Sequence, residues 1–435
     1  AASLELQATS RKLEARSYGG GQFLHLGVRL AVVFLFFSDS FMNWKAYGIV
    51  TAAVVIVGLA LGVTLPLVSL RLHEWGYSTF AIGVMAGMPA VGIVLGAKLT
   101  GRLAGQLGSE NALRLVMACS AVSVVLLAVW PSYAVWLLLR LVLGISLTVT
   151  FVIGESWINQ LVVDRLRGRL VAVYGSAFAL SQLCGPLLLG FIGTEGDGGF
   201  WLATALLVGG VGLLFCVSGA PVVDAAAGAG RGLRQFVRSM PAIAWAMVLF
   251  AGFETMTLTL LPVYLIREGF AQQLALIMVS TVVVGDAILQ VPIGWLADKF
   301  SRTALFKFCG VILLLSSLAM PFVLHTVLIW PVLVLFGSSA GGLYTLSIIL
   351  VGQRFRDDAL VRANAHIAML WGLGCLLGPV ATGAASQWLN THALPMMMAI
   401  AALVFVVLAW RRGAFAAVAV DQAGLEQDTL PRRAD

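Results

Sequence analysis

Four charged residues lie inside otherwise apolar stretches of the 435-residue chain, namely Arg140, Glu155, Glu254 and Asp286. A charged side chain at the centre of a lipid bilayer costs about 2.5–3.5 kcal/mol on insertion scales. Such residues are therefore rare in membrane segments, where they are either paired or functional. These four positions are the first candidates for chemistry in this chain.

Glu254 and Asp286 are the candidates for carrying a proton. Each lies about 11 residues from the same end of two consecutive apolar segments, which places both roughly 16 Å deep if the segments are helical. Two carboxylates at one depth can share a proton, since like charges and removal from water both favour the protonated form. The alternative is a hydrogen bond to a neighbouring helix, through Thr255 or Gln290.

Glu155 and Arg140 lie in one segment but roughly 22 Å apart along a helix, so they cannot pair directly. Glu155 is near one end of its segment. Proton carriage is one role for it, and a gate contact with Arg167 or Arg169 is the other. Arg140 is a candidate for binding the anionic group of a substrate or for holding a carboxylate of the same half, and a structural salt bridge is its alternative.

Aromatic residues are frequent in the apolar segments, and Tyr344 and Trp371 are candidates for lining a substrate pocket, although packing explains such residues equally well. The sequence contains no Gly-x-Ser-x-Gly, phosphate-binding loop or His-Glu-x-x-His motif, and its five cysteines form no Cys-x-x-Cys pair. We therefore expect neither an enzyme nor a metal site nor a cofactor. Transport by such a chain would be driven by an ion gradient.

The composition indicates which elements position these residues. Hydrophobic residues make up 60% of the chain and charged residues only 11%, whereas soluble domains carry about 25% charged residues. The sequence predicts an all-α membrane protein with twelve spanning segments. Their approximate bounds are 46–70, 78–100, 112–130, 133–157, 169–193, 199–219, 242–266, 272–297, 303–324, 326–351, 362–388 and 392–411.

The sequence also contains an internal repeat at an offset of 193 residues, so that position 101 corresponds to position 294. The aligned pairs are 101–108 with 294–301, Gly144 with Gly337, Arg169 with Arg362, and Gly185-Pro186 with Gly378-Pro379. Internal duplication in an apolar, helix-rich chain is typical of transporters whose substrate site lies near the midplane between the repeats. The predicted parts are an N-terminal extension 1–45, a six-helix bundle 46–219, a linker 220–241, a second six-helix bundle 242–411 and a tail 412–435.

Lysine and arginine in the short loops predict the orientation. The loops on one side contain only two basic residues, Arg71 and Arg267. The loops on the other side contain Arg102, Arg114, Arg165, Arg167, Arg169, Arg231, Arg234, Arg238, Lys299, Arg302, Lys307, Arg354, Arg356, Arg362, Arg411 and Arg412. We expect this basic side, with both termini and the linker, to be cytoplasmic.

In the N-terminal extension, the apolar run 30–37 is too short to span a bilayer. A signal segment, an interfacial helix and an over-extended reading frame with its true start at Met42 are the alternatives.

Residues 294–302 read Gly-Trp-Leu-Ala-Asp-Lys-Phe-Ser-Arg, which resembles the loop between helices 8 and 9 of the major facilitator superfamily. The resemblance implies that Asp298, with Arg302 beside it, takes part in a cytoplasmic gate. In the first-half copy the acidic position is Gly105 and the next is Gln106, so this copy has lost the pattern. Residues 140–144 are similar to the Arg-x-x-x-Gly element of the superfamily. Residues 154–157, with 167–169 and Tyr174, resemble its YcaD-like branch. Gly185-Pro186 and Gly378-Pro379 resemble the helix-5 element of proton-coupled antiporters in the superfamily.

The resemblance implies two pseudo-symmetric six-helix bundles that provide alternating access to a central site. We expect a proton-coupled secondary transporter of a small molecule in the bacterial inner membrane, exporting it by proton antiport. An importing proton symporter is the first alternative, and a lipid translocator or receptor on the same scaffold is the second. The expected partners are the substrate, protons and membrane lipid, with no nucleic acid, and a monomer suffices for this mechanism.

Overall fold

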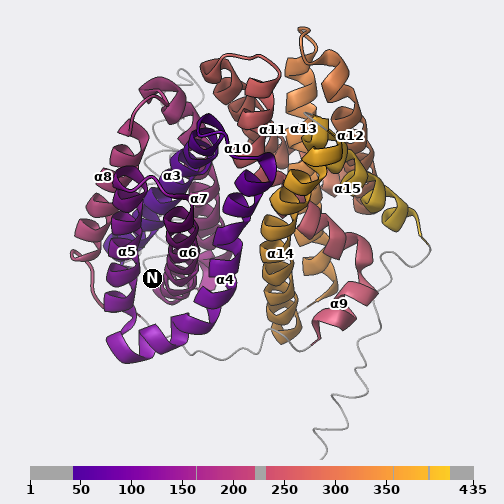
Figure 1. Cartoon of the computed structure of the whole chain (residues 1–435). Helices are drawn as coiled ribbons and strands as arrows, with labels where there is room; N and C mark the ends of the chain where they lie inside the picture. Colours follow the sequence, from indigo (N-terminus) through magenta and orange to yellow (C-terminus); the bar gives the residue numbers. More distant parts are fainter. Residues whose placement is uncertain (1–42, 163, 221–231, 356, 390–391, 412–435) are drawn as a thin grey trace, which may run out of the picture. The chain divides into compact units, whose positions relative to one another are not determined.

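The computed structural model describes residues 43–162, 164–220, 232–355, 357–389 and 392–411. The expectations for residues 1–42 and 412–435 lie outside the described residues. The described residues from Lys45 onward belong to one compact unit. The described chain is helical, as Figure 1 shows, and no strand occurs in it. The helices are α3 (Trp44–Glu74), α4 (Thr79–Leu107), α5 (Ser109–Val129), α6 (Tyr133–Leu161), α7 (Asp164–Ile192), α8 (Gly198–Leu214), α9 (Leu233–Ser239), α10 (Pro241–Arg267), α11 (Gln272–Lys299), α12 (Arg302–Val323), α13 (Ile329–Arg354), α14 (Asp357–Leu389) and α15 (Ala393–Trp410).

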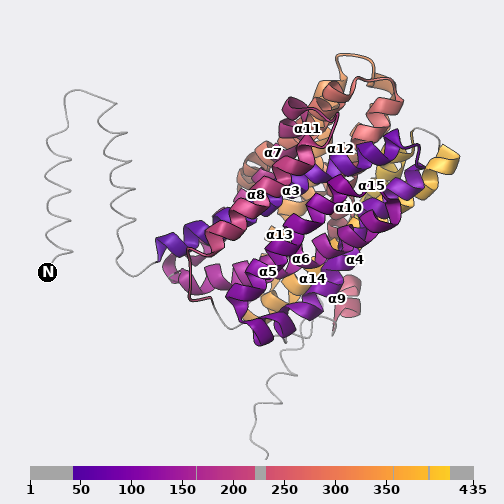
Figure 2. The same ribbon diagram turned by 60° about the vertical axis from the view of Figure 1, so that its left-hand side comes forward.

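The predicted membrane fold is confirmed, with one segment shorter than expected. Eleven described helices are long and apolar enough to cross a membrane. The remaining apolar helix, α8, ends at Leu214 and not near residue 219. The backbone N–H of Phe215 donates to the carbonyl of Gly212, three residues back, so Phe215 has already left the regular α-helical pattern. The helices appear from a second direction in Figure 2.

Glycines that the duplication relates occupy equivalent places in the structure. Gly144 of α6 lies against the carbonyl of Pro89 on α4, and Gly337 of α13 lies against the carbonyl of Val282 on α11. In each case a methyl group on the glycine would overlap the backbone of the facing helix. Close backbone approach at small residues is how membrane helices associate without a hydrophobic driving force.

The second duplicated glycine makes the same kind of contact between the other helices. Gly185 of α7 packs on Gly62 of α3, and Gly378 of α14 packs on Gly252 of α10. The helix pair α3–α7 in the first six long helices therefore corresponds to the pair α10–α14 in the last six. The offset found in the sequence thus corresponds to a repeat of packing.

Helix α4 uses its small residues for two different contacts. Gly83 and Gly87 face α14, where they lie against Pro379 and Leu376. Gly92 and Gly96, further along α4, face α6 instead. The first pair therefore joins the first six long helices to the last six, while the second pair packs within the first six.

The short helix α9 is attached to the last six helices by an aromatic contact. The Phe236 ring is buried, and its centre lies 5.4 Å from that of His366 on α14 and 6.2 Å from that of Phe355. Arg234 and Arg238 on the same helix are exposed. Arg234 and Arg238 are four residues apart, a spacing that places them on one helix face, and α9 is a helix within the predicted linker.

Candidate functional site

Glu254 and Asp286 lie at the middle of two neighbouring helices, α10 and α11. Their charges interact, so the two carboxylates are close enough to influence each other. Both side chains are partly exposed. Within the described residues, neither forms an ion pair with a lysine, arginine or histidine.

The carboxylate of Asp286 is fixed in place by its surroundings. Gln290, one turn further along α11, donates a hydrogen bond of 3.0 Å from Nε2 to Oδ1. On the facing helix α13, Gly341 leaves space for the same oxygen, since a methyl group on Gly341 would overlap it. The predicted contact with Gln290 is thus present, but within α11 and not between helices.

Glu254 is held less tightly. The Thr255 hydroxyl, predicted as a partner, donates instead to the carbonyl of Ala251 at 3.0 Å. No described residue donates a hydrogen bond to the Glu254 carboxylate. Cys375 of α14 lies in electrostatic range of it, as does Tyr344 of α13. The Glu254 carboxylate is therefore free to gain and lose a proton or a ligand.

Three aromatic rings form a cluster near this pair, and one of them, Tyr344, interacts electrostatically with both carboxylates. Phe250 lies one turn before Glu254 on α10, and residues spaced by four share a helix face. Its ring stacks on Tyr344 at 4.8 Å and meets Trp371 edge to face at 6.3 Å, while Tyr344 and Trp371 are 6.0 Å apart. Phe250 is buried, whereas Tyr344 and Trp371 are partly exposed. We call Glu254, Asp286, Tyr344 and Trp371 the carboxylate–aromatic site.

Arg140 is placed differently from this site. It lies on α6 among the first six helices with 0% of its surface exposed, and its Nη2 donates only a long hydrogen bond of 3.4 Å to the carbonyl of Thr64. Nε and Nη1 have no hydrogen-bond partner in the described structure. The alternative of a structural salt bridge therefore finds no carboxylate within bonding distance among the described residues.

Comparison with known proteins assigns the scaffold. The family described as Major Facilitator Superfamily matches residues 50–342 and again 243–424. The chain belongs to the Major Facilitator Superfamily. A transporter named "Uncharacterized MFS-type transporter YcaD" from Escherichia fergusonii is 25% identical over 367 residues, covering 83% of this chain and 94% of the relative. Membership makes the chain a secondary transporter and not an enzyme.

Solved structures share the transporter fold. A D-xylose-proton symporter aligns with a TM-score of 0.69 at 16% identity, over 85% of this chain and 97% of its own. A bacterial homologue of the human lysosomal transporter Spinster, in an inward-facing and unoccupied conformation, aligns with a TM-score of 0.70 at 13% identity, over 86% and 96%. At these identities the likeness shows the major facilitator fold alone.

Glu155 lies near the end of α6 in the transporter and is exposed. Its charge acts on the hydroxyl of Tyr174 on α7, a buried group that has no hydrogen-bond partner in the described structure. The predicted partners Arg167 and Arg169 have side chains outside the described ones. Glu155 is thus on a different helix from every residue of the carboxylate–aromatic site, which is formed by α10, α11, α13 and α14.

The loop motif after α11 is only partly described. The Asp298 side chain lies outside the described ones. Arg302 donates from Nε to the carbonyl of Ala297 at 3.0 Å, so it closes the end of α11. Beside it, Lys299 lies over the ring of Trp295, 3.7 Å from the centre.

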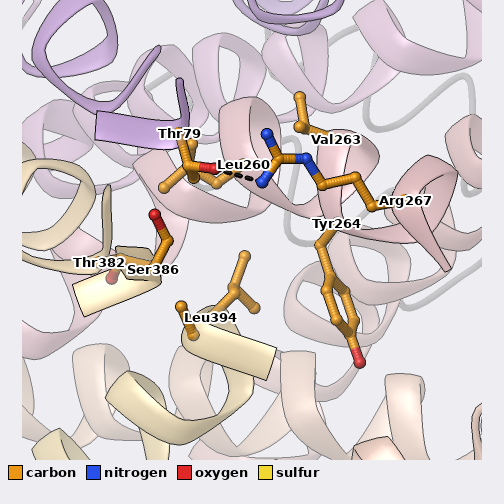
Figure 3. A pocket seen from close by; sticks show the side chains of 9 residues that line it. Thr79, Leu260, Val263, Tyr264, Arg267, Thr382, Ser386 and Leu394 are labelled. Atoms are coloured by element: carbon orange, nitrogen blue, oxygen red, sulfur yellow. Dashed lines mark hydrogen bonds between the residues drawn. The ribbon is translucent and has the colours of Figure 1, made fainter. Parts of the chain in front are cut away.

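A small pocket lies where α4, α10, α14 and α15 meet, as Figure 3 shows. In its wall Arg267 of α10 donates a hydrogen bond to the hydroxyl of Thr79 at the start of α4. We call this the Arg267–Thr79 contact. Sequence reasoning missed it. The only signal was that Arg267 is one of two basic residues in its set of loops.

Proposed function

We propose that this major facilitator protein is a proton-coupled antiporter that exports small amphipathic compounds across the bacterial inner membrane, with both termini in the cytoplasm. The observation that carries the proposal is the pair Glu254 and Asp286, at the middle of neighbouring helices and without a basic partner in the described chain. Two six-helix bundles, 46–219 and 242–411, would rock around this site.

The physical reason for coupling is the cost of charge inside the membrane. A carboxylate without a counter-ion is expensive when the site closes. Protonation of Glu254 removes the charge of that carboxylate, and a bound cationic group neutralises it. The transporter can therefore switch the site from one side of the membrane to the other when the site holds a proton or such a substrate. When the site holds neither, this conformational change has a high free-energy cost. A transporter that obeys this condition exchanges the two.

Arg140 bears on the choice between antiport and symport. An importer of an anionic metabolite would need a basic group that faces the substrate path. Arg140 is fully buried and its guanidinium turns to the carbonyl of Thr64 on α3. The residue that would have favoured symport of an anion is thus buried in this structure, which argues against symport of an anionic metabolite.

The test is proton flux in proteoliposomes that contain a trapped pH-sensitive dye. With an imposed pH gradient, a panel of lipophilic cations and small organic anions is added to the wild type, Glu254→Gln and Asp286→Asn. We expect compound-dependent flux in the wild type, opposite in direction to the compound. Either substitution should reduce it by at least about tenfold, because Glu254→Gln removes the group that exchanges the proton and Asp286→Asn removes the neighbouring charge that acts on it. Glu195→Gln, at an exposed carboxylate, is the matched control.

Other outcomes would contradict the proposal in distinct ways. Flux that survives both substitutions but is lost in Glu155→Gln would move the proton site to α6. Flux in the same direction as the compound would establish symport. Movement of lipid without any pH gradient would favour a lipid translocator, and absence of flux with every compound would leave a receptor on this scaffold.

A further inference from the structure

The carboxylate–aromatic site has a chemical character that restricts its ligand. Its charged groups are Glu254 and Asp286, and its other partly exposed members are the rings of Tyr344 and Trp371. Asp286 already accepts a hydrogen bond from Gln290. The one strong acceptor without a described donor is therefore the carboxylate of Glu254.

This inventory disfavours two classes of ligand. An anion would meet two carboxylates and no described lysine, arginine or histidine within ion-pair distance of them. A polyhydroxylated compound needs many side-chain hydrogen bonds, because hydrogen-bond groups left unpaired inside a site are costly. Here the amide of Gln290 already donates to Asp286, and Phe250 with Tyr344 and Trp371 forms a cluster of rings.

A cation with apolar groups satisfies both parts of the site. The π systems of tyrosine and tryptophan attract a cation that lies near their faces, and the attraction is stronger where water is excluded. A carboxylate at the same place supplies the opposite charge. Phe250 is buried and in ring contact with both Tyr344 and Trp371, so it adds apolar packing next to the two partly exposed rings.

We propose that the site binds lipophilic organic monocations, with the positive charge at the Glu254 carboxylate and the apolar groups against Tyr344 and Trp371. This inference rests on the proposed antiport and names its substrate class. Binding of one monocation displaces one proton from Glu254 to water, so the charge of the site is unchanged. The titratable groups that face Glu254 from the packed helices are Asp286 of α11, Tyr344 of α13 and Cys375 of α14.

The test uses two ions of nearly identical shape and opposite charge. Tetraphenylphosphonium and tetraphenylborate are presented to the purified full-length transporter in detergent, and binding is measured by equilibrium dialysis. Ethidium serves as a second, planar cation. We expect both cations to bind and tetraphenylborate not to bind. Glu254→Gln should weaken cation binding by at least about tenfold, and Trp371→Ala by several-fold. Glu195→Gln and a gel-filtration profile of each variant control for folding.

Proton release into weakly buffered solution on cation binding is recorded in parallel. We expect about one proton per cation for the wild type and none for Glu254→Gln. Failure of both cations to bind, or binding of tetraphenylborate as tight as that of the phosphonium, would overturn the substrate class. Flux of protons with a neutral compound would then still support coupling. Cation binding that depends on Glu254 but releases no proton would instead uphold the cation site and refute the proposed antiport.

Discussion

At the scale of single residues, the candidate site depends on its charged groups and also on small neighbouring residues that leave room for them. Asp286 accepts a hydrogen bond from Gln290 and fits against Gly341 of α13. Glu254 has no such support in the described structure. The two carboxylates therefore differ in mobility, and we assign proton and cation exchange to Glu254 and a positioning role to Asp286.

Gly341→Ala tests this positioning. The new methyl group would overlap the Asp286 carboxylate, so the aspartate or the α11–α13 contact must shift. We expect a loss of stability of about 1–3 kcal/mol, typical of overpacking, together with reduced coupling of proton flux to the compound. Thermal unfolding in detergent and the proteoliposome assay measure the two effects.

Gly372→Ala is the control for that change. Gly372 lies on α14, and a methyl group there would meet nothing within 4 Å. Alanine is also the better helix former, so stability should be unchanged or slightly raised. Equal behaviour of the two variants would show that the space at Gly341 does not fix Asp286.

At the scale of helices, the duplication makes a quantitative comparison possible. Gly144 and Gly337 are related by the offset, and each allows its helix to approach the backbone of a neighbour, α4 or α11. The physical demand is the same in both places. Equivalent substitutions should therefore have similar effects on stability.

Gly144→Ala and Gly337→Ala are each expected to lower the midpoint of thermal unfolding by a similar amount, corresponding to about 1–3 kcal/mol. Only Gly337→Ala should also impair proton coupling, because its methyl group would approach the backbone nitrogen of Asp286 as well as Val282. Gly105→Ala, at a position with open space, should do neither. A large effect at one of the two related glycines with none at the other would contradict the repeat of packing.

Features that depend on residues close together in the sequence could be predicted, whereas features that depend on contacts between distant residues could not. The apolar segments were predictable because hydrophobic length is a local property, and the exception, α8, differs at its end. The partners of Thr255 and Arg140 were not predictable. They depend on which side chain or carbonyl is nearest in three dimensions, as for the contact of Arg140 with Thr64. The grouping of Phe250, Tyr344 and Trp371 required knowledge of how α10, α13 and α14 pack.

At the scale of the whole transporter, contacts between the first and last six long helices lie at the end that contains Thr79. Among the glycines of the described chain, those that reach across are Gly83, Gly87, Gly190 and Gly383. They lie in the half of each helix that is nearer this end. The Arg267–Thr79 contact adds a charged hydrogen bond there. Alternating access requires this end to separate in another state, so we expect the Arg267–Thr79 contact to set the balance between states.

Arg267→Gln should shift that balance toward the state in which the Thr79 end is open. An exposed hydrogen bond of this kind contributes about 1 kcal/mol, which corresponds to roughly a fivefold change in the ratio of states. Arg71→Gln is the matched control, since Arg71 is the other basic residue of these loops and binds Gly196 and Asp197 within the first six helices. Spin labels at the exposed positions Ser78 and Gln273, with the native cysteines replaced by serine, report the separation. Longer distances in Arg267→Gln but not in Arg71→Gln are expected, because only Arg267 joins the two sets of helices. An unchanged distribution in Arg267→Gln would mean that the glycine contacts alone keep this end closed.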